Sequence, residues 1–299
     1  MNILLTGGTG FIGSYVLEIL KKNNNSKILV LSRSKNKKTI NDNVIWHSCD
    51  LSESNSYKNI VHEFAPNILI HLSWEGIPDF SYKMCLKNLN SSIELINIVA
   101  SSSSIKKILV TGSCFEYNKF QGECNETHNC VSKDYFTWSK NAVLDYLKLK
   151  CTENNISYSW SRLFYVYGPG QREKSLIPVL INFINQNQVP ELRTPKNSND
   201  FVYVEDVAKC IVEMSLNFTS SGIYNIGSGQ STPILDITKI AENIINNDNK
   251  LTKKLFKNSI KSLKTVDFWA NLDKTKKDFK WLPETSLHTG ISKLINHNL

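Results

Sequence analysis

A glycine-rich turn directly follows the first apolar run of the chain. Residues 3–6 have the character of a buried strand, the next seven residues read GGTGFIG, and a helical pattern covers about 11–22. Glycines at this spacing make a tight turn, let a pyrophosphate approach the backbone, and let the helix pack closely on the strand. The helix N-terminus then directs its partial positive charge at the phosphates. The order strand, turn, helix predicts a dinucleotide-binding turn, with contacts expected at Gly7, Gly10, Phe11, Ile12 and Gly13.

Apolar runs alternate with helical patterns through the first half of the chain. Strands are expected at 3–6, 27–32, 44–48, 67–72, 107–111 and 157–163, and the longer helices at about 87–101 and 137–154. Such alternation produces βαβ units around a parallel sheet, and near-continuous apolar strands indicate burial on both faces. We predict an α/β fold, with a Rossmann doubly wound parallel sheet in residues 1–164 and a smaller mixed C-terminal substrate lobe in residues 165–299. The segment at about 223–227 is expected to rejoin the first domain.

Composition narrows the class of protein. With 41% hydrophobic residues among 299, the chain can bury a large core. It has no run of about 18 apolar residues, and its first residues read as a strand, so neither a membrane span nor a signal peptide is expected. The seven cysteines lack zinc-ligand spacing, which indicates free thiols in a cytoplasmic protein and no metal site. The net charge of +8 comes almost entirely from lysine, which favours a solvated surface that attracts anionic ligands over a nucleic-acid site.

The end of the second strand bears on the choice of cofactor. A carboxylate there would bind the ribose 2′-hydroxyl and favour NAD(H), but the sequence reads Ser32-Arg33-Ser34. An arginine at this position can pair with a 2′-phosphate, so NADP(H) is favoured over NAD(H), with Arg33 as its contact. Asp50 and Leu51 follow the third strand and can reach the adenine, although Asp50 also suits a helix N-cap. Leu72 ends the fourth strand and is expected beside the cofactor.

Further motifs follow in a definite order. They are Ile70–Trp74, Asn88, Thr111–Tyr117, Ser139-Lys140, Arg162–Gly170, Asp200–Val207, Tyr224–Gly229 and Trp281–Pro283. Taken with the glycine turn, they resemble the extended short-chain dehydrogenase/reductase family, and within it the branch that acts on nucleotide sugars. The resemblance implies that a ketone and an alcohol are interconverted by hydride transfer at the nicotinamide. It also implies that Ser113 hydrogen-bonds the sugar oxygen, that Lys140 holds the nicotinamide ribose, and that two helices pair in a homodimer.

One departure concerns the general acid/base. In the resembled family a tyrosine stands four residues before the lysine, but here that residue is Phe136, which cannot exchange a proton. Tyr135 is five residues before Lys140, roughly 140° round the helix, and is the first guess for a replacement. Cys114, Glu116 or a water held by Ser113 are further candidates. Alternatively, a hydroxyl of the ligand relays the proton, or the protein binds its ligands without ordinary turnover.

The substrate side also departs from the resembled family. Tyr165 stands where an asparagine usually contacts the diphosphate, and Asn199 replaces an arginine that clamps it. Arg172 or Arg193 can take over that clamp, because a guanidinium binds phosphate bidentately. Cys114 occupies a substrate-side position where dehydratases carry the first residue of an Asp-Glu pair, which argues against elimination of water.

The resemblance, with Arg33 at the end of the second strand and no Asp-Glu pair after Ser113, favours an NADPH-dependent reductase of a nucleoside-diphosphate 4-keto-6-deoxy sugar in surface polysaccharide synthesis. Its catalytic residues are expected to be Ser113, Lys140 and Tyr135, and the sugar nucleotide is the expected partner. One alternative is a nucleotide-sugar epimerase with tightly bound NAD. Another is a non-catalytic dinucleotide-binding regulatory or scaffold protein, since a fold does not fix a function.

Overall fold

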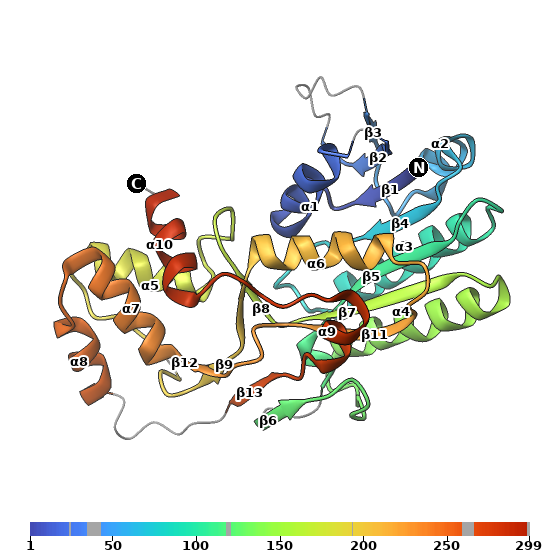
Figure 1. Cartoon of the computed structure of the whole chain (residues 1–299). Coiled ribbons are helices and arrows are strands. Elements are labelled where there is room, and N and C mark those ends of the chain that lie inside the picture. The colour runs from blue at the N-terminus through green and yellow to red at the C-terminus, as the bar shows by residue number, and fades with distance from the viewer. Residues whose placement is uncertain (24, 35–42, 118–120, 193, 259–265, 298–299) are drawn as a thin grey trace.

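A seven-stranded parallel sheet forms the centre of the larger lobe in this computed structural model, which describes residues 1–23, 25–34, 43–117, 121–192, 194–258 and 266–297 (Figure 1). The strand order is β11-β7-β5-β4-β1-β2-β3. The strands are β1 (Asn2–Thr6), β2 (Lys27–Ser32), β3 (Val44–Ser48), β4 (Ile68–His71), β5 (Lys107–Ser113), β7 (Ser157–Leu163) and β11 (Gly222–Ile226). Every pairing between neighbours is parallel, which confirms the predicted fold class. The order reverses between β1 and β4, where ligands bind in sheets of this kind.

Helices cover both faces of this sheet. One face carries α1 (Phe11–Lys21) and α6 (Val204–Leu216), and the other carries α2 (Lys58–Phe64), α3 (Tyr82–Ala100) and α4 (Tyr135–Glu153). Alternate residues of β1 show why: Ile3 and Leu5 are buried with α1 and α6, whereas Leu4 is buried with α3 and α4. Each such side chain contributes roughly 1.5–3 kcal/mol when fully buried. The apolar strands are therefore stabilised from both sides, as the sequence predicted.

The boundaries of most predicted elements lie within two residues of the observed ones. The largest error is the start of α3, which begins at Tyr82, five residues before the expected start. The Ser81 side chain accepts a hydrogen bond from the Met84 N–H at 3.4 Å and caps this helix. Serine is a favoured N-cap residue, so the signal was present in the sequence and was missed.

The smaller lobe combines short strands with helices. A four-stranded sheet has the order β12-β9-β13-β6, and β8 pairs with β10 in a separate two-stranded sheet. The strands are β6 (Gln121–Cys124), β8 (Tyr165–Tyr167), β9 (Ser198–Asn199), β10 (Phe201–Tyr203), β12 (Thr232–Pro233) and β13 (Asp267–Ala270). The helices are α5 (Leu176–Asn185), α7 (Ile234–Asn246), α8 (Lys250–Asn258) and α10 (Leu287–His297), gathered on the left in Figure 1. Two single 3-10 turns, η1 (Ser54–Ser56) and η2 (Cys114–Glu116), complete the first half.

The chain passes between the two lobes more than once. β11 lies beside β7 at the edge of the large sheet, where the segment at about 223–227 was expected to return. α6 and α9 (Asp273–Phe279) also pack on the large sheet. Conversely, β6 belongs to residues 1–164 in sequence but pairs with β13 in the sheet of the smaller lobe. Residues 1–164 and 165–299 are therefore interleaved in space, more than a single boundary implies.

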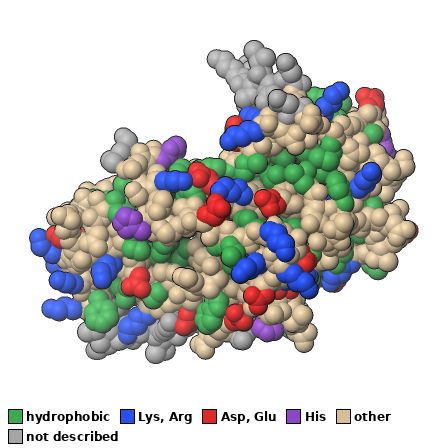
Figure 2. Space-filling model, in the orientation of Figure 1, with side chains coloured by type: hydrophobic (Ala, Val, Ile, Leu, Met, Phe, Trp, Pro, Cys, Tyr) green, Lys and Arg blue, Asp and Glu red, His purple; other side chains and the backbone are tan. Residues whose placement is uncertain are grey.

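Charged side chains of both signs are spread over the face drawn in Figure 2, across both lobes, and the basic ones do not form one continuous patch on it. Among the helices of the described residues, none is long and apolar enough to cross a membrane.

Candidate functional site

The glycine turn forms a cradle at the carboxyl end of β1. Gly7 has a φ of +75°, and a Cβ there would lie 2.9 Å from the backbone of Leu72. A Cβ on Gly13 would lie 2.0 Å from the Gly7 carbonyl oxygen, so the first turn of α1 can pack on the loop only with glycine at this position. The N-terminus of α1 begins directly after Gly10. The cradle therefore fits the diphosphate of a dinucleotide.

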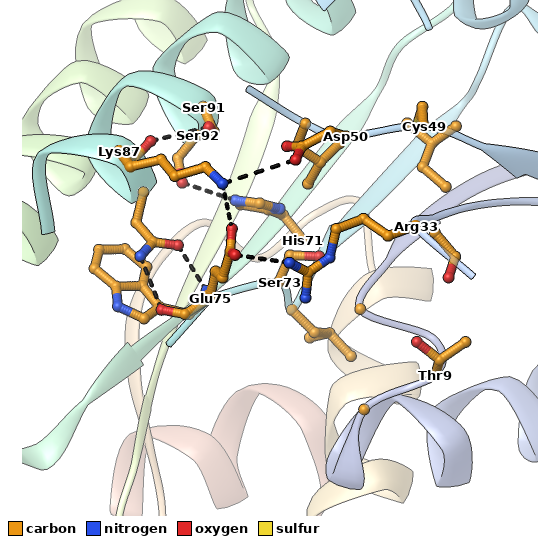
Figure 3. A pocket seen from close by; sticks show the side chains of 18 residues that line it. Thr9, Arg33, Cys49, Asp50, His71, Ser73, Glu75, Lys87, Ser91 and Ser92 are labelled. Atoms are coloured by element: carbon orange, nitrogen blue, oxygen red, sulfur yellow. Dashed lines mark hydrogen bonds and ion pairs between the residues drawn. The ribbon is translucent and has the colours of Figure 1, made fainter. Parts of the chain in front are cut away.

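Two cavities adjoin the cradle and share part of their lining. The first has a volume of about 230 Å³ and is drawn in Figure 3; the second has a volume of about 540 Å³. The residues common to both are Gly7, Gly10, Arg33, Leu72, Trp74 and Glu75. The first cavity extends to the ends of β2 and β3, and the second extends over β5 and α4 towards the smaller lobe. The two cavities therefore adjoin at the glycine turn, an arrangement that a dinucleotide and a second ligand can share.

All ten residues predicted to bind the cofactor line these cavities. Asp50 and Leu51 line the first cavity, and Phe11, Ile12, Gly13 and Lys140 line the second. The residues that line both are Gly7, Gly10, Arg33 and Leu72.

Four charged side chains form a chain of ion pairs in the first cavity (Figure 3). Arg33 Nη1 lies 2.7 Å from Glu75 Oε1, and Lys87 Nζ lies 2.8 Å from Glu75 Oε2. Lys87 Nζ is also 3.7 Å from Asp50 Oδ2. The hydrogen bond from Lys87 lowers the pKa of Glu75, and Arg33 acts in the same direction. Sequence reasoning missed Glu75 and Lys87, which no motif singled out.

His71 lies behind this chain and takes no part in it. Its ring nitrogens lie 2.7 Å from Thr6 Oγ1 and 3.0 Å from Ser92 Oγ. Burial lowers the pKa of His71 to about 3, and the nearby Lys140 acts in the same direction. The imidazole is therefore neutral at physiological pH and serves to tie β1, β4 and α3 together.

The second cavity contains Lys140 and Ser113. Lys140 Nζ donates a hydrogen bond to the Thr111 carbonyl oxygen at 2.8 Å and lies 3.8 Å from the centroid of the Trp74 ring. The side chain is buried, and burial lowers its pKa to about 7 although the Glu116 carboxylate acts in the opposite direction. Ser113 Oγ accepts a hydrogen bond from the Phe115 N–H at 3.2 Å and lines the cavity with Lys140.

Phe136 fills the place expected for a phenol. It lies one helical turn before Lys140 on α4 and lines the same cavity. Its ring packs edge-on against Trp74, with 5.6 Å between centroids, and lies tilted against Phe80, with 4.6 Å between centroids. These three rings make the wall around the lysine apolar, which weakens competition from water for any hydrogen bond made there.

Of the suggested proton donors, the structure does not bring the side chains of Tyr135, Cys114 and Glu116 to this cavity. Tyr135 is 53% exposed and packs on Tyr82 at 5.4 Å, in a separate surface depression with Trp138. Cys114 is buried, and burial raises its thiol pKa well above the ordinary value. Glu116 is fully buried and bonded to Arg162 at 2.9 Å. None of the three lines the second cavity. The expectation that Tyr135 acts there is wrong, because its side chain points away from Lys140 on α4 and towards the surface.

Of the residues predicted to bind the substrate, some line the second cavity and others do not. Arg172 lines the second cavity and donates from Nη1 to the Ile77 carbonyl oxygen at 2.5 Å. Tyr165 is instead enclosed by aromatic rings, with Phe201 at 5.6 Å and Phe115 at 6.0 Å, and does not line the cavity. Arg193 lies outside the described residues. Residues of this cavity that sequence reasoning did not assign include Phe80, Phe115, Gln171 and Ser175.

A model of the NAD dependent epimerase/dehydratase family matches residues 3–227, from β1 to the residue after β11. The chain belongs to this family. The match confirms the resemblance that the motifs indicated, and it includes the glycine turn, Ser113 and Lys140. Members of the epimerase/dehydratase family are NAD(P)-dependent enzymes that modify nucleotide sugars.

Individual relatives of the chain span several activities. It is 26% identical to a dTDP-D-glucose 4,6-dehydratase of Dictyostelium discoideum over 81% of its length, but spans only 62% of that protein. It is 25% identical to a dTDP-4-dehydro-6-deoxyglucose reductase of Escherichia coli, with 98% of this chain and 96% of the relative covered. A UDP-glucose 4-epimerase of Thermotoga maritima superposes with a TM-score of 0.80 at 21% identity, covering 100% of this chain and 98% of the other. The structural similarity shows the same fold as that epimerase, and the relatives carry out dehydration, reduction and epimerisation.

Proposed function

We propose that the chain is an NADPH-dependent reductase of a nucleoside-diphosphate 4-keto-6-deoxy sugar. The observation that carries the proposal is the second cavity, where Lys140 and Ser113 are present but Phe136 stands at the acid/base position. Reduction of a ketone by hydride requires a proton donor but no general base, and an ammonium group or a bound water can donate that proton. An epimerase must also remove a proton from a sugar hydroxyl, for which the family position now offers a hydrocarbon ring. The full-length similarity to a reductase supports the same direction.

The residues of the chain divide the work of this reaction. When bound, NADPH would supply a hydride to the carbonyl carbon of the sugar. The glycine turn would hold its diphosphate, and Ser113 Oγ would donate a hydrogen bond to the sugar carbonyl oxygen. The Lys140 ammonium would hold the nicotinamide ribose and supply the proton to the alkoxide, directly or through one water. Trp74, Phe80 and Phe136 would exclude bulk water from the reacting atoms.

The cofactor proposal rests on two cations of the first cavity. Arg33 and Lys87 both line it, and a 2′-phosphate is an anion that such side chains bind well. We further propose a cytoplasmic homodimer paired through α3 and α4, working in surface polysaccharide synthesis.

The test is consumption of NADPH, followed by its absorbance, with a panel of 4-keto-6-deoxy sugars carried on dTDP, GDP, CDP and UDP. Turnover of the sugar on one of these nucleotides, lost in Lys140→Met, would support the reductase and would identify the nucleotide that the substrate carries. Flat traces with a protein that binds NADPH would contradict the reductase and leave the epimerase or a non-catalytic role.

A second candidate is an epimerase with tightly held NAD. The observation in its favour is Glu75, a carboxylate close to Arg33 at the end of β2, because NAD sites use a carboxylate near this position for the ribose hydroxyls. This enzyme would copurify with cofactor and convert a nucleotide sugar without added reductant.

A further inference from the structure

The first cavity contains two cations that are already paired with one carboxylate. Glu75 bonds Arg33 through one oxygen at 2.7 Å and Lys87 through the other at 2.8 Å. Arg33 follows β2, and Glu75 follows β4, while β1 lies between these strands in the sheet. The ion pair therefore spans the carboxyl end of β1, where the glycine turn begins. In the free protein, the Glu75 carboxylate is therefore paired with both Arg33 and Lys87, the two cations proposed to bind the 2′-phosphate of NADP(H).

The backbone of Glu75 is fixed in this position. Asn88 Oδ1 accepts a hydrogen bond from the Glu75 N–H at 2.7 Å, and Asn88 Nδ2 donates to the Glu75 carbonyl oxygen at 3.0 Å. A further bond from Asn88 Nδ2 to the Met84 carbonyl oxygen at 2.9 Å ties the amide to α3. Asn88 is itself buried. The backbone of Glu75 is therefore held at the cavity by a buried side chain, which keeps the carboxylate within reach of Arg33 and Lys87.

We propose that Glu75 competes with the 2′-phosphate of NADP(H) for Arg33 and Lys87, and so sets how strongly the protein prefers NADP(H) to NAD(H). The inference rests on the proposed cofactor. It adds a specificity-determining residue that lies far in sequence from the end of β2, where that choice is ordinarily read.

The charges of the cavity explain the competition. Arg33 and Lys87 are balanced by Glu75 and Asp50, so these four side chains carry no net charge together. A 2′-phosphate brings a charge of about −1.5 to −2 at neutral pH, which Glu75 repels while it holds both cations. Asp50 is a weaker competitor, because it is 3.7 Å from Lys87 and is bonded to the Ser52 N–H and hydroxyl at 2.9 and 2.8 Å. NAD(H) lacks this phosphate and does not need the two cations to be released.

The experiment compares Glu75→Gln with the unmodified protein by calorimetric titration with NADPH, NADH, 2′,5′-ADP and 5′-AMP. Glutamine keeps the size of the side chain and removes its charge. We expect NADPH and 2′,5′-ADP to bind more tightly by on the order of tenfold, as removal of a like charge at close range implies. NADH and 5′-AMP should change less than about twofold by the same reasoning. Arg33→Ala should weaken NADPH and 2′,5′-ADP selectively.

A matched control is Glu63→Gln, which makes the same change of net charge at an exposed position of α2 that lines neither cavity. It should leave all four affinities unchanged. Equal changes for NADPH and NADH in Glu75→Gln would overturn the inference, since they indicate a merely structural role. Weaker NADH with unchanged NADPH would also overturn it and assign Glu75 to the ribose hydroxyls.

The two proposals can fail separately. An unmodified protein that reduces a sugar with NADPH, but whose Glu75→Gln variant shows no selective gain, loses only the inference on Glu75. A protein that binds neither dinucleotide loses both.

Discussion

At the scale of single residues, Phe136 cannot exchange a proton, so Lys140 is the proposed proton donor. Its pKa is lowered to about 7 by burial, so the ammonium form exists below that pH and is lost as the pH rises through it. An acid with a pKa near the working pH is well suited to proton transfer. We expect kcat/KM for NADPH-dependent reduction to fall by about tenfold per pH unit above roughly pH 7, because this ratio reports ionisation in the free enzyme. A flat profile through this range would show that the proton has another source.

Restoring the phenol tests whether Lys140 already supplies the proton. Phe136→Tyr should leave the affinity for NADPH nearly unchanged, because the ring keeps its place between Trp74 and Phe80. If the lysine or a bound water is an effective acid, kcat should change by less than ~10-fold, about 1.4 kcal/mol in the barrier. Single-turnover kinetics at saturating substrate measure this step. A gain of several hundredfold would mean that no working acid existed before the substitution.

At the scale of elements, a buried ion pair joins the end of β5 to β7. Glu116 accepts hydrogen bonds from Arg162 Nε and Trp160 Nε1, each at 2.9 Å, and from the Ser113 N–H at 2.6 Å. Removing one partner of a buried pair leaves the other charged without compensation, which costs about 3–5 kcal/mol. We expect Glu116→Ala to lower the free energy of unfolding in denaturant by this amount.

The exposed pair between Lys150 and Glu153 is the matched control for that loss. Glu153→Ala removes the same side chain from a surface ion pair, which ordinarily contributes little. Similar stabilities for the two variants would contradict the structural role assigned to Glu116.

The elements were largely predictable because the strands are apolar on both faces and the glycine turn fixes where the first helix begins. Residues 3–6, 27–32 and 157–163 needed almost no revision. The predictions failed where the decisive contacts are long-range. β6 belongs to the small sheet only because it pairs with β13, more than a hundred residues later, and no local pattern announces that pairing.

The site residues that belong to sequence motifs were predictable, and those outside the motifs were not. The glycine turn, Arg33, Ser113 and Lys140 all line the two cavities, as their positions at strand and helix ends suggested. Glu75 escaped notice because its meaning depends on a partner 42 residues away. Tyr135 was misplaced because one residue along a helix rotates a side chain by about 100°, enough to direct it to the surface.

At the scale of the whole molecule, the outer surface of α3 and α4 carries unusually exposed apolar side chains. Leu149 is 72% exposed, Tyr82 53% and Trp138 40%. Trp138 and Leu149 lie on α4, eleven residues apart, and therefore on one face of it. Contiguous exposed apolar surface marks an interaction site more often than scattered side chains do. The proposed homodimer pairs through α3 and α4, and a second copy of the chain seated on this face would bury these side chains.

We therefore expect the unmodified chain to have the mass of a dimer in solution, measured by light scattering. Leu149→Glu should shift it towards a monomer, because two carboxylates would have to be buried at a symmetric interface without partners. Leu282→Glu is the matched control, since Leu282 is also exposed, at 44%, but lies outside α3 and α4. NADPH affinity should be the same in both variants, because neither leucine lines the cofactor cavities. A monomeric unmodified chain, or a dimer that Leu149→Glu leaves intact, would exclude pairing through this face.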